Sequence, residues 1–497
     1  MTVFRRILKA LGIGLIALLV LFAVAVVWPA PRAPLPDSGQ NRLIANVRII
    51  DIESGTIGQI TRLRISGGRI AAIGPDLRAN GGEPVFDGKG GYLIPGLWDM
   101  HVHTFQSSPQ THFPLWIANG VTQVRDMMDC PGTRDSLIAC HVDKLRWNNE
   151  VASGRMAAPT IVETASFYLA SSKLTPQQAS ERVAEYDARG LPAIKVYNQL
   201  SSPAYHAAAR ESAKRNLRLV GHLPQAVSLK EALAAGQYSF EHAHLLPRAC
   251  FARDAQRRSG ALSGLAPTTL LETIVAEYDP RGCDALLAAF AATGAWYVPT
   301  HVTREDDVRA FDTGGSASPA LDYLDPLSAW AWNDDQGALR VAHPGKRGER
   351  AVRAYFSHGL RLTGKAHEAG VRILVGTDTI AGGLRYHDEL AHLVAAGMAP
   401  AEVLRAATIE AARYVGKDRD AGTIAIGKRA DLVLLAADPL TDIANTRSIR
   451  AVIQNGRLYD QNRLEDLDGF ARRQAWAPLN WAKLLWGFAR SSVNAEM

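Results

Sequence analysis

The stretch GYLIPGLWDMHVH, residues 91–103, combines the pattern of a buried strand with two histidines at its end. Its apolar residues predict a strand, and residues two apart in a strand point to the same side. His101 and His103 would therefore present both imidazoles from one strand end. Imidazole nitrogen is a common ligand of zinc and similar divalent ions. The stretch thus indicates a metal site at the end of a strand.

Seven further segments with strand patterns follow, and helical patterns separate them. These segments are VTQVRDMM (121–128), PTIVETASF (159–167), LPAIKVY (191–197), RLVGHLP (218–224), YSFEHAHLL (238–246), WYVPTHV (296–302) and RILVGTDT (372–379). Alternation of this kind predicts an α/β fold, a closed parallel (β/α)₈ TIM barrel over residues 91–416. Active sites of such barrels form at the carboxyl ends of the strands. Residues 305–350 are too long for a simple connection, so we expect a lid or an insertion near the site there.

The segments that flank the barrel alternate short apolar runs with turns. Such patterns are typical of antiparallel strands. We expect residues 37–90 and 417–462 to form one small β-sandwich domain from both ends of the catalytic region. The tail, residues 463–497, carries several tryptophans, and Trp481 and Leu485 lie at helical spacing. It predicts a helix that either packs on its own domain or touches a membrane surface.

Residues 1–36 begin with basic side chains and continue with an uncharged apolar run over residues 10–28. About 20 apolar residues cross a bilayer core as a helix, and a basic flank favours the cytoplasmic side. A proline-rich spacer follows. We therefore expect a membrane anchor with the catalytic body outside the cytoplasm, on the periplasmic side if the protein is bacterial. A cleaved signal with a periplasmic or secreted body is the alternative.

Composition and charge are those of an ordinary globular protein. Hydrophobic residues make up 47% and charged residues 21% of the 497 residues. The formal charge is +6, and Arg5, Arg6 and Lys9 contribute three of these positive charges. Because the rest of the chain has no cluster of basic residues, the sequence does not support nucleic-acid binding.

The chain contains four cysteines. An oxidising compartment favours their pairing, although four cysteines permit three connectivities. Cys130 and Cys140 flank a short loop, and Cys250 and Cys283 flank a longer insertion, so we predict these two pairs. Four free thiols are the alternative. No Cys-x-x-Cys motif occurs, which argues against a thiolate zinc site.

Four more polar residues lie at predicted strand ends. Lys195 ends the fourth strand, in AIKVY, and His222 ends the fifth, in VGHLP. His242 follows the sixth strand, in FEHAH, and Asp378 ends the eighth, in VGTDT. A carboxylate beside a metal-activated water can accept its proton and pass it to the leaving group, so Asp378 is the candidate catalytic residue. His244 is the alternative to His242 as a ligand.

Lys195 is an unusual residue for a cation site, because an ammonium repels metal ions. Its amine could react with carbon dioxide if it is desolvated and neutral, and the resulting carbamate could bridge two metals. The alternative is an unmodified Lys195 that holds substrate or a neighbouring acid, with a single metal in the site.

The order His-x-His, Lys, His, His, Asp on successive strands resembles the amidohydrolase superfamily, as do GYLIPGLWDMHVH and GTIAIGKRADLVLL (422–435). The IKVY, GHLP, EH and GTDT…HDEL patterns are most similar to its prolidase-like and imidazolonepropionase-related branch. The resemblance extends over residues 42–460. It implies hydrolysis of an amide C–N bond, in dipeptides or N-acyl amino acids, by a metal-activated hydroxide. It also implies two Zn²⁺ ions, bridged by a carboxylated lysine, with the ligands His101, His103, Lys195, His222, His242 and Asp378.

Four residues are candidates for contacting the substrate. Tyr197 follows the lysine of IKVY by two positions and should face the same side, where its hydroxyl could stabilise an oxyanion. Arg125, in VRDMM, could bind a substrate carboxylate or pair with Asp126 or another buried acid. His387, in RYHDEL, could contact substrate or lie on a helix surface. His301, after the seventh strand, is an equally open candidate.

Three classes of function are compatible with these residues. The first is an amide or peptide hydrolase, and the second is a lactone, ester or phosphotriester hydrolase that uses the same metals. The third is a non-catalytic metal-binding barrel. The presence of all six expected metal ligands argues against this third class. The expected partners are a small-molecule or short-peptide substrate and the membrane. Homo-oligomers are compatible with the sequence, which leaves the oligomeric state open.

Overall fold

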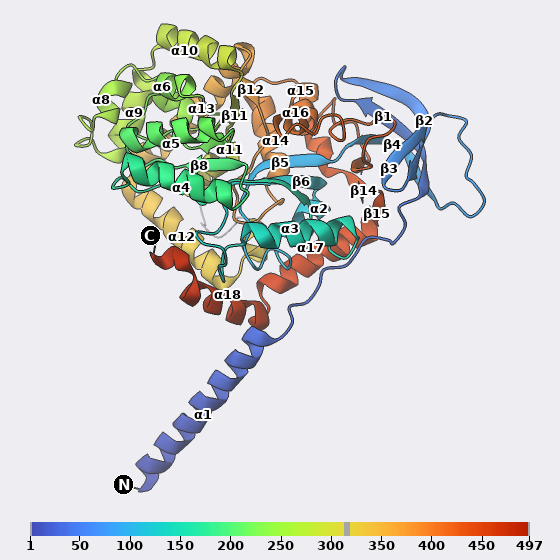
Figure 1. Cartoon of the computed structure of the whole chain (residues 1–497), viewed down its shortest axis with the longest axis horizontal. Coiled ribbons are helices and arrows are strands. Elements are labelled where there is room, and N and C mark those ends of the chain that lie inside the picture. The colour runs from blue at the N-terminus through green and yellow to red at the C-terminus, as the bar shows by residue number, and fades with distance from the viewer. Residues whose placement is uncertain (1, 313–318, 496–497) are drawn as a thin grey trace.

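The computed structural model describes residues 2–312 and 319–495. It has a mixed α/β body, from which the N-terminal helix α1 (Thr2–Val27) projects as a rod (Figure 1). The prediction of an α/β fold with an apolar N-terminal helix is therefore confirmed. Helix α1 is long and apolar enough to cross a membrane from Phe4 to Val27.

The strands of the middle region run parallel and form two sheets. They are β5 (Leu97–Val102), β6 (Val121–Asp126), β7 (Thr160–Thr164), β8 (Ala193–Val196), β9 (Arg218–Gly221), β10 (Ser239–Glu241), β11 (Trp296–Val298) and β12 (Arg372–Ile373). One sheet has the order β12-β11-β10-β9-β8, and the other has the order β5-β6-β7. The sequence predicted one closed sheet. Among the described residues, the end of β7 and β8 are joined by the isolated parallel bridges Ala165–Ala193 and Leu169–Val196 in place of a continuous ladder.

Helices connect these strands and start where the sequence carries helix-initiating residues. Thr175 and Ser228 accept the N–H groups of Gln178 and Glu231 and so cap the first turns of two of them. The connecting helices are α2 (His112–Ala118), α3 (His141–Ala152), α4 (Pro176–Ala188), α5 (Ser202–Lys214), α6 (Leu229–Ala234), α14 (Tyr386–Ala395), α15 (Pro400–Ala406) and α16 (Ile409–Tyr414).

Two longer insertions follow β10 and β11. The first contains α7 (Leu245–Ala249), α8 (Asp254–Arg258), α9 (Pro267–Ala276) and α10 (Pro280–Thr293). The second contains α11 (His301–Arg309), η1 (Pro319–Tyr323), α12 (Pro326–Ala342) and α13 (Gly345–Glu368). The insertion predicted over residues 305–350 thus consists largely of helices, and residues 313–318 of that prediction lie outside the described residues. The insertion after β10 was not predicted as a separate feature.

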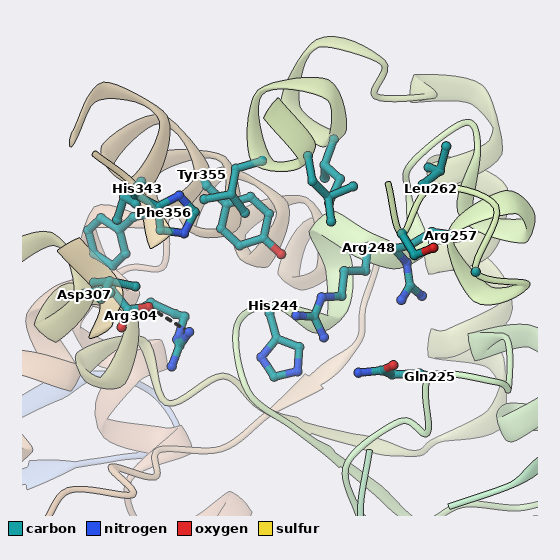
Figure 2. A pocket seen from close by; sticks show the side chains of 17 residues that line it. Gln225, His244, Arg248, Arg257, Leu262, Arg304, Asp307, His343, Tyr355 and Phe356 are labelled. Carbon is teal, nitrogen blue, oxygen red and sulfur yellow. Dashed lines mark ion pairs between the residues drawn. The ribbon is translucent and has the colours of Figure 1, made fainter. Parts of the chain in front are cut away.

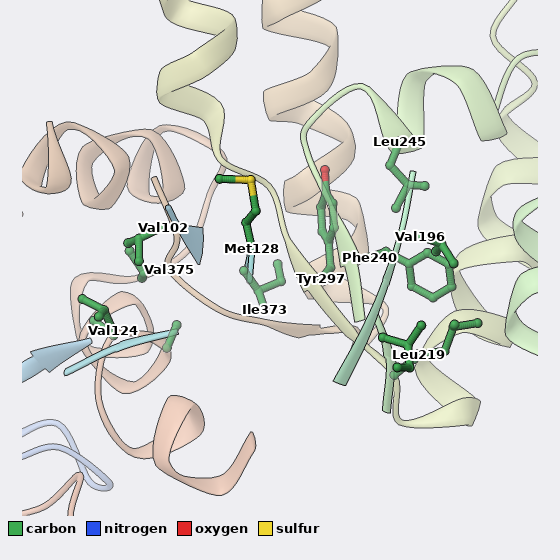
Figure 3. Packing of buried hydrophobic residues seen from close by; sticks show 14 of the residues in the cluster. Val102, Val124, Met128, Val196, Leu219, Phe240, Leu245, Tyr297, Ile373 and Val375 are labelled. Carbon is green, nitrogen blue, oxygen red and sulfur yellow. The ribbon is translucent and has the colours of Figure 1, made fainter. Parts of the chain in front are cut away.

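The main core lies between the parallel strands and the helices that cover them. All residues of β5, β6 and β8 are buried, as expected for parallel strands covered on both faces. Figure 3 shows apolar side chains from the two sheets and their adjoining loops packed together: Val102, Val124, Met128, Val196, Leu219, Phe240, Leu245, Tyr297, Ile373 and Val375. Because this packing fixes the strands, it also fixes the positions of the polar residues at their ends.

The flanking segments form a second sheet of seven strands in the order β15-β14-β13-β4-β1-β2-β3. Its strands are β1 (Arg42–Asp51), β2 (Thr56–Ser66), β3 (Arg69–Ile73), β4 (Val85–Pro95), β13 (Leu432–Leu435), β14 (Ile449–Gln454) and β15 (Arg457–Asp460). Both ends of the catalytic region therefore contribute, as predicted. The 3₁₀ helix η2 (Ile443–Arg447) connects β13 to β14.

Two details of this sheet differ from the prediction. The strands are hydrogen-bonded as one sheet in place of two sandwich layers, and β1 pairs with β4 in parallel. The sheet curls over its own apolar cluster, because the N–H of Ile70 donates to the carbonyl of Lys428, which lies just before β13. Bulges in the β1–β2 and β1–β4 pairs assist the curling. Alternation of apolar residues cannot distinguish a curled sheet from two layers.

Both predicted disulfides are present. Cys130 pairs with Cys140, and Cys250 pairs with Cys283. The first closes the loop before α3, and the second attaches the end of α7 to the first turn of α10. The first disulfide therefore fastens a loop, and the second closes the helical insertion that contains α8 and α9.

The C-terminal tail folds into α17 (Gln461–Ala475), α18 (Pro478–Arg490) and η3 (Ser492–Ala495). Helix α18 lies at the base of the body where α1 emerges (Figure 1). The Nζ of Lys483 donates to the carbonyl of Val26, and the rings of Phe22 and Trp486 meet edge to face. The tail thus packs against the apolar helix as well as against the body.

Candidate metal centre

The ends of β5 and of the segment after β12 bring three predicted ligands together. The Nε2 atoms of His101 and His103 lie 3.6 and 3.1 Å from Oδ1 of Asp378. One ligand atom from each of these residues lies within 4.8 Å of the others, a grouping that could hold a metal ion. His101 is fully buried, whereas His103 and Asp378 are partly exposed. The group is therefore open on one side.

A second pair of histidines lies beside the first group. His222 and His242 follow β9 and β10, and their Nε2 atoms are 3.0 Å apart. Nδ1 of His242 lies 3.0 Å from Oγ1 of Thr300 and 3.7 Å from Oδ2 of Asp378. Asp378 therefore lies between the two groups. His242, and not the alternative His244, is within hydrogen-bond distance of His222.

Lys195 lies in β8, the edge strand of the five-stranded sheet, and its charge acts on His103 and His222. It is 2% exposed, so its amine is almost completely desolvated. Burial lowers the pKa of Lys195 to about 8, although the charges of Asp378 and Glu241 act in the opposite direction. A neutral amine is thus accessible near neutral pH, which a reaction with carbon dioxide requires.

A buried network positions His101. Its Nδ1 lies 3.0 Å from Oε2 of Glu241, whose carboxylate also binds Nη2 of Arg125 at 2.9 and 3.0 Å. Because Nδ1 donates to this carboxylate, the lone pair of His101 is on Nε2, towards Asp378. A carboxylate in this place fixes the tautomer and orientation of a ligating histidine.

Arg125 has no role as a substrate contact, which corrects one of the two predictions made for it. Its side chain is fully buried, and the guanidinium also donates to the carbonyl of Met100 and to the hydroxyls of Ser239 and Tyr414. The alternative, pairing with a buried acid, is correct, but the acid is Glu241. All of its donors are directed at protein atoms, so no substrate carboxylate can reach it.

The backbone at the site adopts conformations that direct the side chains inwards. His242, Thr300 and Asp378 have φ values of 75°, 48° and 51°, in the left-handed region that such residues rarely occupy. Residues in this region cluster at functional sites. A Cβ on Gly376 would lie 2.9 Å from Cβ of His101, so only glycine allows this close approach.

Asp99 fastens the segment that carries Asp378 to strand β5. Its carboxylate accepts the Thr377 hydroxyl at 2.6 Å and the Thr377 N–H at 3.0 Å. Burial raises the pKa of Asp99 to about 7. The N–H of Asp378 in turn donates to the carbonyl of His101 at 2.8 Å. The loop after β12 is therefore held in register with the histidines of β5.

The protonation states suit ligation of a cation. Burial lowers the pKa of His103 and His222, and it lowers that of His242 to about 3. Burial opposes ionisation of Asp378, but the neighbouring His101 and His103 hold its pKa well below the ordinary value. The site therefore presents neutral imidazoles and a carboxylate, which are the forms that bind divalent metals.

Unsatisfied atoms in the site fit a metal ion. Nε2 of His101 is buried without a hydrogen-bond partner among the described residues. Its lone pair faces the carboxylate of Asp378, which cannot donate a hydrogen to it. Nδ1 of His222 is also buried without a hydrogen-bond partner among the described residues. Leaving buried polar atoms unpaired is costly, and a divalent ion would satisfy them. The nitrogen and oxygen donors are those that zinc and related ions prefer.

The remaining predicted contacts fall in different places. The ring of Tyr197 is 4.1 Å from that of His222 and half-buried, so it lies at the edge of the site. His301 is fully buried in α11 and contacts Thr363 of α13 at 3.0 Å. His387 is buried beneath η2, where it lies 2.9 Å from Thr446. Both histidines are buried, so the alternative of an exposed helix surface does not describe His387, and their contact with substrate stays a prediction.

Sequence reasoning missed Glu241 and Thr300 as residues that orient the histidines. Glu241 was visible in the FEHAH motif next to His242, but its partner His101 is 140 positions away. Thr300 follows the end of β11 and so occupies a strand end like the other site residues. Its position after a strand could have indicated a site residue, whereas its left-handed backbone conformation could not be recognised from the sequence.

Comparisons with known proteins indicate the family and the fold. The model of the amidohydrolase family matches residues 92–459. Adenine deaminase 3 of Rhizobium meliloti (strain 1021) is 24% identical over 427 residues, which are 84% of this chain and 57% of that protein. The chain therefore spans little more than half the length of this relative.

Two solved structures are similar in fold. Bottromycin amidohydrolase superposes with a TM-score of 0.68 at 23% identity, over 89% of this chain and 92% of that one. A Xaa-Pro dipeptidase with methionine bound in its active site superposes with a TM-score of 0.59 at 19% identity, over 84% of this chain and 100% of that one.

Proposed function

The chain belongs to the amidohydrolase family, and from this premise we propose that it is a metal-dependent hydrolase of amide C–N bonds in dipeptides or N-acyl amino acids. The observation that carries the proposal is the convergence of two imidazoles and a carboxylate within 4.8 Å. The names of its similar proteins, an adenine deaminase and a Xaa-Pro dipeptidase, both denote cleavage of a C–N bond. This shared chemistry supports the reaction class.

We infer that the site holds two divalent ions, with zinc the best match to its donors. The first ion would be held by His101, His103 and Asp378, and the second by His222 and His242. Lys195, as a carbamate, would bridge them. Its burial and lowered pKa support this modification. Ions bound in such a site lower the pKa of water to about 7 and polarise a carbonyl.

The protein side chains then have separate tasks. Asp378 takes the proton of the attacking water and returns it to the leaving nitrogen, because its carboxylate lies between the two groups of histidines. Tyr197, beside His222, donates its hydroxyl to the oxygen of the scissile carbonyl. Glu241 and Arg125 keep His101 in one tautomer and one orientation.

We also infer that the two parallel sheets are halves of one (β/α)₈ barrel over residues 91–416. The bridges from β7 to β8 support closure on one side. On the other side, the N–H of Met100 in β5 donates to the carbonyl of Val375 after β12. The flanking sheet domain would then comprise residues 37–90 and 417–462.

The body is proposed to be tethered to a membrane by α1, with the catalytic site outside the cytoplasm. The basic N-terminus favours the cytoplasmic side of the anchor, and the two disulfides favour an oxidising compartment for the body. Helix α18 would lie at the membrane surface, because it touches α1 at Phe22 and Val26 near the end of the apolar stretch. Trp486 and Leu485, both exposed, suit that position.

A substrate panel tests the proposed reaction. The purified protein is assayed with dipeptides, N-acyl amino acids, adenine, lactones and phosphotriesters, before and after removal of metal with a chelator. We expect turnover of the dipeptides or N-acyl amino acids that is lost with the metal and restored by zinc or manganese. Exclusive turnover of lactones or phosphotriesters would refute the substrate class but not the metal site.

Asp378→Asn tests the assigned proton transfer. We expect turnover to fall by at least about 100-fold, because general acid–base catalysis contributes about 10²–10⁴-fold, while bound metal is largely retained. Asp420→Asn is a matched control, since that carboxylate is exposed and pairs with Arg69 on the sheet domain. Undiminished turnover of the Asp378 variant would remove its catalytic role.

A further inference from the structure

A cavity of about 420 Å³ is lined in part by His244, two residues after His242. Its walls come from the two helical insertions, as Figure 2 shows for Arg248 and Leu262 on one side and Arg304, Tyr355 and Phe356 on the other. Cavities of roughly 300–1,000 Å³ bind small molecules. Because the helices after β10 form much of the wall, this insertion determines what the cavity accepts.

The cavity is connected to the metal centre by His244. Its ring lies 5.6 Å from that of His242 and 6.3 Å from that of His222. Figure 2 shows His244 at the base of the cavity, between Arg304 and Arg248, with Gln225 beyond Arg248. A molecule bound in the cavity would therefore extend towards the ligands of the second ion.

Three arginines reach the cavity, and they differ in their partners. Arg304 pairs with Asp307 at 2.7 Å, and Arg257 pairs with Asp254 at 2.6 Å. Arg248 has no carboxylate within 4.0 Å among the residues that the structure describes. Burial lowers the pKa of Arg248, the neighbouring Tyr355 opposes this effect, and the charges of Arg257 and Arg304 add to it. The cavity thus contains one guanidinium whose charge no protein carboxylate balances.

A second polar group lies beside this guanidinium. The residue Tyr355 is only 9% exposed, and its hydroxyl interacts with the side chain of Arg248 but has no acceptor for its own hydrogen within hydrogen-bond geometry in the described part of the chain. In Figure 2 this hydroxyl points into the space above Arg248. Buried donors normally have an acceptor, so a hydroxyl hydrogen without one, next to a cation that no carboxylate balances, indicates the place of an anionic acceptor group.

The rest of the lining is largely apolar. Leu262, Leu270, Leu271 and Ile274 come from the first insertion, and Val352 and Phe356 come from α13. The disulfide from Cys250 to Cys283 holds α7, which carries Arg248, against α10. The cation and the apolar wall are therefore parts of one fastened unit.

We propose that this cavity is a substrate subsite for an aliphatic group that bears a carboxylate, and that Arg248 binds the carboxylate with help from the Tyr355 hydroxyl. The inference rests on the proposed function, because it places the amino-acid part of a dipeptide or N-acyl amino acid there while the scissile amide lies at the metals. It adds that the amino acid is apolar, such as leucine. The proposal also predicts that neutral molecules such as adenine are poorer substrates than molecules that carry a carboxylate.

The test compares N-acetyl-leucine with N-isopentylacetamide, which is the same molecule without its carboxylate. The full-length, metal-loaded protein in detergent is assayed for kcat/KM with both compounds. The variants are Arg248→Met, Arg248→Lys and, as a matched control, Arg253→Met, whose arginine pairs with Glu277 on the surface of the same insertion. Equilibrium binding of N-acetyl-leucine is measured for each protein by calorimetry.

We expect the wild-type protein to favour N-acetyl-leucine by about 10- to 100-fold, the range of a charge-assisted contact. The preference should fall towards one in Arg248→Met, remain in part in Arg248→Lys and persist in Arg253→Met. Equal kcat/KM values in the wild-type protein, or a preference that survives Arg248→Met, would overturn the inference.

Binding separates this inference from the proposed function. If neither compound is hydrolysed, the reaction class is wrong. The subsite is nevertheless supported if N-acetyl-leucine binds the wild-type protein at least tenfold more tightly than Arg248→Met. Equal binding to both proteins would overturn the subsite, whatever the turnover.

Discussion

Replacing Glu241 with glutamine removes the charge that balances Arg125 without changing the shape of the side chain. Both side chains of this ion pair are fully buried. Removing one partner of a buried pair costs about 3–5 kcal/mol, because the remaining charge is left in a medium of low dielectric. Arg125 keeps its bonds to Met100, Ser239 and Tyr414, so only the charge compensation is lost.

The same substitution should weaken metal binding. Nδ1 of His101 would lose a carboxylate acceptor and keep only a neutral one. Partners of ligating histidines typically contribute 10- to 100-fold to metal affinity. We therefore expect Glu241→Gln to raise the dissociation constant for zinc by about tenfold, the lower end of this range, since an amide oxygen remains in place.

Urea unfolding of the metal-free protein measures the first effect, and a titration against a competing chelator measures the second. Glu277→Gln is the control, because Glu277 also forms two contacts with an arginine but is 43% exposed. Exposed pairs contribute about 0–1 kcal/mol. A loss below about 1 kcal/mol for Glu241→Gln would refute the assignment of a buried, charge-compensating role.

The double variant with Arg125→Met provides an internal check. Arg125→Met removes the guanidinium charge that Glu241→Gln leaves uncompensated, and that charge is the main cost of breaking a buried pair. We expect it to recover most of the lost free energy of unfolding while metal affinity stays low. Recovery of both properties together would mean that Glu241 acts on the metal site only through overall stability.

Three further predictions concern the lysine, a disulfide and the anchor. Lys195→Ala should lose bound metal, and short carboxylic acids should restore part of it. If metal analysis still finds two ions per chain in this variant, a bridging carbamate is contradicted. Replacing Cys130 and Cys140 with serine should lower the free energy of unfolding by about 2–4 kcal/mol, whereas equal stability of the variant and the oxidised wild type would contradict it. Deletion of residues 1–28 should release an active body from the membrane fraction. A truncated body that stays bound until Trp486→Ser is added would assign the attachment to α18.

The order of elements and most of the centre were predictable from local patterns. Strand-forming runs ended by His101, His222 or His242 are short-range signals, since apolar periodicity and a polar strand end lie within one segment. The disulfides were predictable for a similar reason, because each pair flanks a single loop or insertion. The N-terminal helix required only its uninterrupted apolar length.

Tertiary structure alone decided which buried charges meet and which histidines face the site. Arg125 and Glu241 are 116 positions apart, and nothing in VRDMM indicates whether its arginine faces a substrate or a carboxylate. His301 follows a strand end closely, whereas His387 lies in α14, and both side chains are buried against Thr363 and Thr446 from distant segments. The curl of the seven-stranded sheet and the cavity around Arg248 arise likewise from contacts between distant segments. Local patterns determine elements, whereas the pairing of charges and the shape of cavities depend on how those elements pack.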